Sequence, residues 1–202
     1  MIEFILLIAA AYLIGSIPTG VIVGRMQGFD PRGVGSGNIG MTNVARAGGS
    51  KAAAITFIGD ILKGAIPVAI ARAFGFTPSI VAAVAIAAFI GSICSVFLGF
   101  SGGKGVSAAL GIWLVISPIV LLIALAVFIA VFAVSRIMSL ASICAAIALP
   151  PAALATGLPR HYVLLAIIMS ALVLFRHLEN IQRLRLGEEP KFSTKRSEKA
   201  SA

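Results

Sequence analysis

Charged side chains, and acidic ones above all, are scarce in this chain. Only 11% of its 202 residues are charged and only seven are Asp or Glu, whereas 59% are hydrophobic. The mean hydropathy is +1.08. Because an ordinary soluble domain carries about 25% charged residues, this composition excludes that class and indicates an all-α integral membrane protein.

Histidine and cysteine are also rare, with two of each in the chain. Neither His161 nor His177 has a carboxylate pair at metal-ligand spacing, so we expect no metal site and no cofactor. Cys94 and Cys144 lie far apart in apolar stretches, which is typical of buried small residues. We therefore look for function among Lys, Arg, Asn, Ser and the backbone.

Basic residues are in excess, with 16 Lys and Arg and a formal net charge of +9. They are not interleaved with aromatic residues, so we expect no nucleic-acid partner. At a membrane surface, such an excess attracts anionic lipid heads or anionic substrates.

Hydrophobic runs of membrane-spanning length follow one another along the chain. A helix needs about 20 apolar residues to cross a bilayer, and five runs have about that length: 3–24, 53–74, 79–98, 139–156 and 160–178. The remaining run, 106–134, would be roughly 43 Å long as one helix at about 1.5 Å per residue. Ser117-Pro118 lies near its middle. We expect a break there, which gives seven transmembrane helices with helices four and five short.

The distribution of basic residues favours the same count, because short cytoplasmic loops collect Lys and Arg. With seven helices, the basic loops and the basic tail share one face, and only Arg72 and Arg160 remain on the other. We therefore expect the N-terminus outside, without a cleaved signal peptide, and the C-terminus in the cytoplasm. Residues 1–186 are predicted to form one transmembrane catalytic domain, and residues 187–202 a short charged cytoplasmic tail.

The polar segment Gly35 to Arg46 separates the first two hydrophobic runs. Its glycines, hydroxyls and amides beside an arginine are typical of an anion site. Gly102-Gly-Lys-Gly105 has a similar composition, although a tight turn would also explain it. Neither segment indicates a nucleotide site, because no strand precedes the first and Gly105 stands where a P-loop has Ser or Thr.

Further polar residues lie at helical spacing. His177 and Asn180 are three residues apart, on one face of a helix end. Asp60 and Lys63 form a similar pair inside the second run, where a functional role and a structural tether are both open. Ser139 and Ser142 also lie three apart; they either face a site or bond within their helix.

Several segments together resemble the bacterial acyl-phosphate:glycerol-3-phosphate acyltransferases, over nearly the whole chain. They are Gly15-Ser-Ile-Pro18, Gly35 to Arg46, Asp60 with Lys63-Gly64, Gly102-Gly-Lys-Gly-Val106, Ser139-Leu-Ala-Ser142, and His177 through Asn180-Ile-Gln-Arg-Leu184 to Gly187 and Glu189. The resemblance implies a seven-helix enzyme of the bacterial inner membrane with its active site on the cytoplasmic face. Such an enzyme transfers a fatty acyl group from acyl phosphate to the 1-hydroxyl of sn-glycerol 3-phosphate. The products are lysophosphatidic acid and phosphate, in the first acylation step of phospholipid biosynthesis.

Resemblance and charge together assign the site residues. Glycerol 3-phosphate is expected to contact Ser36, Arg46, Lys104, His177 and Asn180. Acyl phosphate is expected to contact Gly40, Thr42, Asn43 and Ser142, which would also stabilise the oxyanion. The predicted binding set is completed by Gly37, Asn38, Gly102, Gly103 and Glu189. The residues predicted to be catalytic are Lys104, His177, Asn180 and Ser142.

The sequence departs from this family at a few positions. Ser92 and Ser95 stand where relatives commonly have His and Pro, and Leu178 stands where a basic residue is common. The His-x-x-x-x-Asp pair of many glycerolipid acyltransferases is absent, because Ala166 and Gln182 occupy the Asp position after the two histidines.

Acyl phosphate is already an activated anhydride, so we expect direct transfer by positioning and electrostatics rather than through an acyl-enzyme. The proton would pass to a substrate phosphate oxygen or to His177. The acyl tail is expected in a groove open to the lipid, and the soluble enzyme that makes acyl phosphate is a possible partner for the basic tail. From the residues alone, an anion or phosphate-ester transporter is the alternative.

Overall fold

The computed structural model describes residues 2–192 of the chain. Within these residues the chain is helical and contains no named strand. The α-helices are α1 (Ile2–Ser16), α2 (Thr19–Met26), α3 (Met41–Ala73), α4 (Pro78–Ile93), α5 (Val106–Ile116), α6 (Pro118–Ser135), α7 (Met138–Ala155), α8 (Arg160–Arg176) and α9 (Leu178–Arg185). Two 3₁₀ turns, η1 (Pro31–Gly33) and η2 (Val96–Leu98), lie in the connections. The predicted charged tail lies outside the described residues beyond Phe192.

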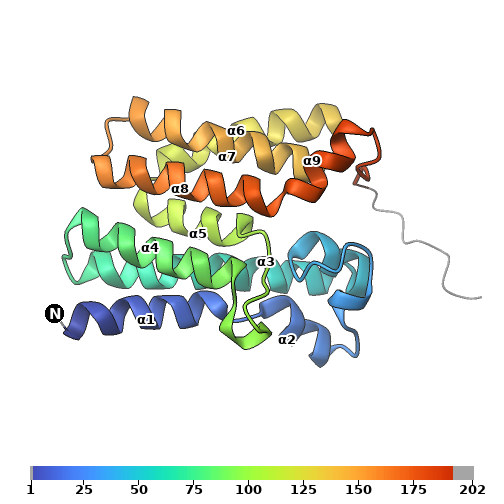
Figure 1. Ribbon diagram of the computed structural model, residues 1–202, viewed down its shortest axis with the longest axis horizontal. Coiled ribbons are helices and arrows are strands. Elements are labelled where there is room, and N and C mark those ends of the chain that lie inside the picture. Colours follow the sequence, from blue (N-terminus) through green and yellow to red (C-terminus); the bar gives the residue numbers. More distant parts are fainter. Residues whose placement is uncertain (1, 193–202) are drawn as a thin grey trace, which may run out of the picture.

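The long helices run side by side along the long axis of the molecule (Figure 1). Helix α4 lies among α1, α3, α5 and α8, and its Phe89 is fully buried together with Trp113 of α5. Helix α2, the segment that leads into α3, and helix α9 all lie at the end opposite the N-terminus (Figure 1). The bundle therefore gathers several polar segments at one end.

Three helices, α3, α6 and α7, are each long and apolar enough to cross a membrane. Two bent pairs reach that length together: α1 with α2, bent by 43°, and α8 with α9, bent by 60°. Helices α4 and α5 are shorter apolar helices. The count of seven spans and the orientation of the termini stay predictions.

Some helix ends differ from those predicted. The run 3–24 is two helices rather than one, because Pro18 has no N–H and restricts the residue before it. The run 79–98 is helical only to Ile93, after which Gly99 and Phe100 adopt left-handed backbone conformations. Helix α3 begins before residue 53, at Met41, and changes direction at Gly49, whose φ of 82° and ψ of −175° are not helical. Helix α5 ends at Ile116, and α6 begins at Pro118 and has 18 residues.

Two cations of α3 bond to carbonyl groups at the chain's proline breaks. The Lys63 ammonium lies 3.1 Å from the Ile17 carbonyl oxygen and 2.7 Å from the Asp60 carboxylate, which also accepts from the Thr19 hydroxyl. The Arg72 guanidinium donates to the carbonyls of Val115 and Ile116. Pairing of this kind is needed because an unpaired carbonyl in an apolar surrounding is costly.

Candidate functional site

The turn before α3 is organised by the buried amide of Asn43, of which 2% is exposed. Its Nδ2 donates to the carbonyl oxygens of Pro31, Val34 and Asn38, at 2.7, 2.9 and 2.8 Å. Its Oδ1 accepts from the Ser36 N–H at 3.1 Å. A single side chain thus holds the loop closed over the start of α3, so Asn43 shapes the loop.

The exposed residues of this loop are those that can meet a ligand. Ser36, Gly37 and Arg46 are exposed, and Asn38 and Thr42 are half-buried. The Asn38 carboxamide oxygen accepts from the Gly40 N–H at 2.8 Å, directly before the first turn of α3. The free N–H groups of that turn, with the Arg46 side chain one turn further on, form a cationic and donor-rich surface.

Helix α2 packs directly against the backbone of this loop at Gly20. A methyl group built on Gly20 would overlap the Ile39 carbonyl oxygen and approach the Val44 side chain. The absence of a side chain at Gly20 therefore allows α2 to contact the loop backbone directly, beside Asn38 and Gly40.

The glycine loop, defined as residues 102–105, lies against the first loop. A methyl group on Gly103 would be 4.0 Å from Asn38 Oδ1 and 3.8 Å from the Ile39 side chain. The Gly103 N–H donates to the Ser92 carbonyl at 3.0 Å. Within residues 2–192, no protein group accepts from the N–H of Lys104. The structure thus brings together the two segments that the sequence singled out as anion sites.

Lys104 extends from the glycine loop toward the end of α8 and the start of α9. Its ammonium donates to the Asn180 carboxamide oxygen. The Asn180 amide nitrogen donates in turn to Glu189 at 2.6 Å. Glu189 also accepts from the Ser139 hydroxyl at 2.6 Å and from Arg183 Nε at 2.7 Å. Because the carboxylate accepts a hydrogen bond from the amide nitrogen, the Asn180 oxygen is turned toward Lys104.

His177 and Ser142 each bond to a backbone carbonyl group four residues earlier in the chain. His177 is buried, and its Nδ1 lies 2.8 Å from the Val173 carbonyl oxygen. A carbonyl only accepts, so Nδ1 carries the hydrogen and Nε2 of the neutral ring is left as an acceptor. The Ser142 hydroxyl donates to the Met138 carbonyl at 2.8 Å, which is the intrahelical alternative that the spacing left open.

The electrostatic balance of the cluster follows from burial and hydrogen bonding. Burial lowers the pKa of Lys104 to about 8, against the opposing effect of the Glu189 charge. Burial acts to raise the pKa of Glu189, but hydrogen bonds from Ser139, Asn180 and Arg183 outweigh it and leave that pKa below its ordinary value. A second anion, such as a phosphate, would favour the charged form of Lys104.

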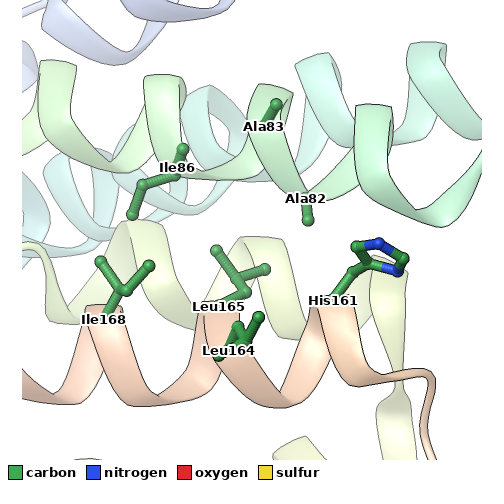
Figure 2. Close-up of a pocket in the computed structure, with 7 residues that line it drawn as sticks. All are labelled: Ala82, Ala83, Ile86, His161, Leu164, Leu165 and Ile168. Atoms are coloured by element: carbon green, nitrogen blue, oxygen red, sulfur yellow. The ribbon is translucent and has the colours of Figure 1, made fainter.

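An apolar groove with a volume of about 180 Å³ lies apart from this cluster, between α4 and α8. Figure 2 shows the side chains of both helices facing it, with His161 at one end. Its lining residues are Ala82, Ala83, Ile86, His161, Leu164, Leu165 and Ile168. His161 is the second residue of α8 and His177 follows its end, a separation of roughly 24 Å at about 1.5 Å per residue. The groove is therefore distinct from the polar site.

Some residues of the cluster were not assigned from the sequence. Arg176 bonds to the glycine loop, although no role in the site was predicted for it from the sequence. Ser139 reaches Glu189 across 50 residues of sequence. The only sequence signal for Arg176 is its position directly before His177, and no local pattern indicates the Ser139 contact.

Comparison with known proteins gives one consistent result. The glycerol-3-phosphate acyltransferase family matches residues 5–187. The chain is 47% identical over 192 residues to the glycerol-3-phosphate acyltransferase of Geobacter sulfurreducens, which covers 95% of this chain and 99% of that protein. It is 50% identical over 193 residues to that of Geobacter metallireducens, with coverage of 95% and 99%.

A solved structure is similar to this chain in fold as well as in sequence. The crystal structure of PlsY (YgiH), an integral membrane glycerol 3-phosphate acyltransferase, superposes in its glycerol 3-phosphate form with a TM-score of 0.91. The identity is 41%, over 95% of this chain and 96% of that one. The lysophosphatidic acid form of the same protein gives a TM-score of 0.89 at 40% identity, with the same coverage.

Proposed function

The chain belongs to the glycerol-3-phosphate acyltransferase family of integral membrane proteins, and from that premise we propose that its acyl donor is acyl phosphate. The reaction would join the acyl group to the 1-hydroxyl of sn-glycerol 3-phosphate and release lysophosphatidic acid and phosphate. The observation that carries the proposal is the hydrogen bond from Lys104, in the glycine loop, to Asn180. The glycine loop also lies beside Asn38, in the polar segment before α3, so the two segments form one site.

Both substrates carry a phosphate, and the site offers two groups of donors. We assign Lys104, Asn180, His177, Ser36 and Arg46 to glycerol 3-phosphate, because they combine cations with neutral donors. The phosphate would replace the Asn180 oxygen as the acceptor of the Lys104 ammonium. It would also accept from the backbone N–H of Lys104, which has no protein acceptor within residues 2–192.

The second group of donors is assigned to acyl phosphate. The first turn of α3 follows Gly40, whose N–H donates to Asn38, and the Asn43 N–H donates to the Gly40 carbonyl oxygen. Within residues 2–192, the backbone N–H groups of Met41 and Thr42 have no protein acceptor and are left to bind acyl phosphate. Ser142 is included with them, on the condition that its hydroxyl leaves the Met138 carbonyl when substrate binds. Fixed donors of this kind stabilise the oxyanion that develops at the carbonyl carbon.

The chemical step balances without a covalent enzyme intermediate. The 1-hydroxyl oxygen bonds to the acyl carbon, the bond from that carbon to the bridging oxygen breaks, and phosphate leaves with the electron pair. The hydroxyl proton goes to a substrate phosphate oxygen or to Nε2 of His177, which the bond at Nδ1 leaves free to accept. The protein would contribute mainly by positioning.

The location proposed for this chemistry is the cytoplasmic face of a bacterial inner membrane. The gathering of α2, α9 and the loops at one end of the bundle supports it, since a transporter would hold its polar groups near the middle of the bilayer (Figure 1). The acyl tail would then extend from that end between helices toward the lipid.

Donor choice tests the proposal. Purified protein in lipid is given glycerol 3-phosphate with acyl phosphate, acyl-CoA or an acyl carrier protein thioester, and lysophosphatidic acid is quantified. We expect product from acyl phosphate alone. Product from either thioester at a comparable rate would contradict the donor assignment, and a trapped acyl-enzyme would contradict direct transfer.

A further inference from the structure

Arg176, the last residue of α8, bonds to two successive carbonyl groups of the glycine loop. Its Nη2 donates to the Gly102 oxygen at 2.7 Å, and its Nε donates to the Gly103 oxygen at 3.2 Å. The side chain is half-buried. A basic residue that only marks the cytoplasmic side of a helix would turn toward lipid head groups or water, so this geometry needs another explanation.

The two bonds hold the peptide groups that precede Lys104. The peptide between Gly102 and Gly103 is held from both sides, because its oxygen accepts from Arg176 and its N–H donates to Ser92. The next peptide has its oxygen on Arg176, and in a trans peptide the N–H points the opposite way. The Lys104 N–H is therefore directed away from the guanidinium.

The same bonds join the two parts of the proposed glycerol 3-phosphate site. Arg176 directly precedes His177 and lies four residues before Asn180, across the 60° bend between α8 and α9, while its guanidinium bonds to the loop that carries Lys104. The planar guanidinium presents two N–H groups in a fixed arrangement, whereas a lysine ammonium is a single point donor on a flexible stem. Two carbonyls one residue apart therefore favour arginine.

We propose that Arg176 is a positioning residue for glycerol 3-phosphate: by holding Gly102 and Gly103 it keeps Lys104 and its N–H group opposite Asn180. This inference rests on the proposed function. Arg176 needs no contact with substrate in this role, because its guanidinium donates to the Gly102 and Gly103 carbonyl oxygens.

The test compares Arg176→Lys with wild type and with Arg160→Lys, a matched control at the exposed opposite end of α8. KM for each substrate and kcat are measured in lipid. We expect Arg176→Lys to raise KM for glycerol 3-phosphate about tenfold, or about 1.4 kcal/mol. KM for acyl phosphate should stay within about twofold, and Arg160→Lys should match wild type. Arg176→Gln, which loses the charge as well, should have a larger effect in the same direction.

Two results would overturn the inference. One is an unchanged KM for glycerol 3-phosphate in Arg176→Lys. The other is an equal loss for both substrates together with a lowered Tm, which would mean that Arg176 only stabilises the fold.

Direct binding separates this inference from the proposed function. Calorimetric titration of glycerol 3-phosphate into wild type and Arg176→Lys needs no donor. If wild type binds it more tightly than the variant but forms no lysophosphatidic acid from any donor, the proposed reaction fails and the role of Arg176 stands. Equal affinities would overturn the role of Arg176 and leave the reaction to the donor assay.

Discussion

At the scale of single residues, Lys104 is the group on which the proposed site depends most. Its ammonium donates to Asn180, and Lys104 is the cationic residue of the glycine loop, whose other residues are glycines. Lys104→Met keeps the length of the apolar stem and removes the charge. We expect KM for glycerol 3-phosphate to rise by about tenfold to a hundredfold, because a phosphate would lose a charge-assisted bond of about 1.5 to 3 kcal/mol. Steady-state kinetics in lipid measure this change.

The control for this variant is Lys51→Met, which changes an exposed lysine of α3. It should leave both KM values within about twofold of wild type. If Lys104→Met behaved like Lys51→Met, the phosphate would have to bind elsewhere.

The lowered pKa of Lys104 predicts a pH dependence. Burial brings this pKa to about 8, so the ammonium is charged below that pH and loses its proton as the pH rises through it. KM for glycerol 3-phosphate should therefore increase above about pH 8, while the phosphate itself stays doubly charged. The measurement is KM across roughly pH 7.5 to 9.5 for wild type and Lys104→Arg, whose guanidinium stays protonated. A wild-type KM as flat as that of the variant would contradict the assignment.

His177 distinguishes the two destinations of the proton. If a substrate phosphate oxygen takes it, His177→Ala should keep kcat within about tenfold of wild type and raise KM only. If Nε2 takes it, kcat should fall by about a hundredfold or more, since general-base catalysis contributes roughly that factor. The measured kcat at saturating substrates decides between them.

At the scale of elements, contacts from a short helix to a loop determine where the residues of the site lie. Helix α2 touches the Ile39 carbonyl through the bare face of Gly20. Gly20→Ala should push that carbonyl away and displace Asn38 and Gly40 with it, so both KM values should rise at least about tenfold. Gly33→Ala is the matched control, because a methyl group there meets nothing within 4 Å. Equal kinetics for the two variants would show that α2 does not position the loop.

The buried pair of Asp60 and Lys63 fastens the junction of α1 and α2 to α3. Lys63→Met leaves the Asp60 carboxylate and the Ile17 carbonyl without the ammonium that both now contact. Breaking a buried pair from one side costs about 3 to 5 kcal/mol, so Tm should fall by several degrees. Thermal unfolding in detergent measures it, and the double variant with Asp60→Asn should recover part of the loss. An unchanged Tm would exclude the tether.

The sequence could predict most helices, because the apolar runs and the break at Ser117-Pro118 are visible in it. Helix α7 lies within one residue of its predicted bounds at each end. The break at Pro18 was not predicted, since hydropathy continues through it and local backbone chemistry decides it. For the site, the sequence located three polar segments: Gly35 to Arg46, residues 102–105, and His177 to Glu189. It did not predict the contacts between residues of these segments. The bonds from Asn43 to three carbonyls and from Arg176 to two depend on how the chain is placed in the folded protein.

At the scale of the whole molecule, α2, α9 and the segment that leads into α3 lie at one end of a bundle of long helices (Figure 1), of which α3, α6 and α7 are each apolar enough to cross a membrane. A reaction between a lipid-soluble donor and a water-soluble acceptor requires a boundary between apolar and polar surroundings, because each substrate arrives from a different phase. Within residues 2–192, the end of α8, the start of α9, the glycine loop and the start of α3 meet at that end of the bundle.

Direct acyl transfer from acyl phosphate to glycerol 3-phosphate is tested by the stoichiometry of the reaction in purified, lipid-reconstituted protein that is given both substrates. Direct transfer predicts one lysophosphatidic acid for each phosphate released, acylated at the 1-hydroxyl, with no phosphate release beyond background when glycerol 3-phosphate is omitted. Phosphate released without glycerol 3-phosphate, or lysophosphatidic acid absent while phosphate accumulates, would contradict direct transfer at this site.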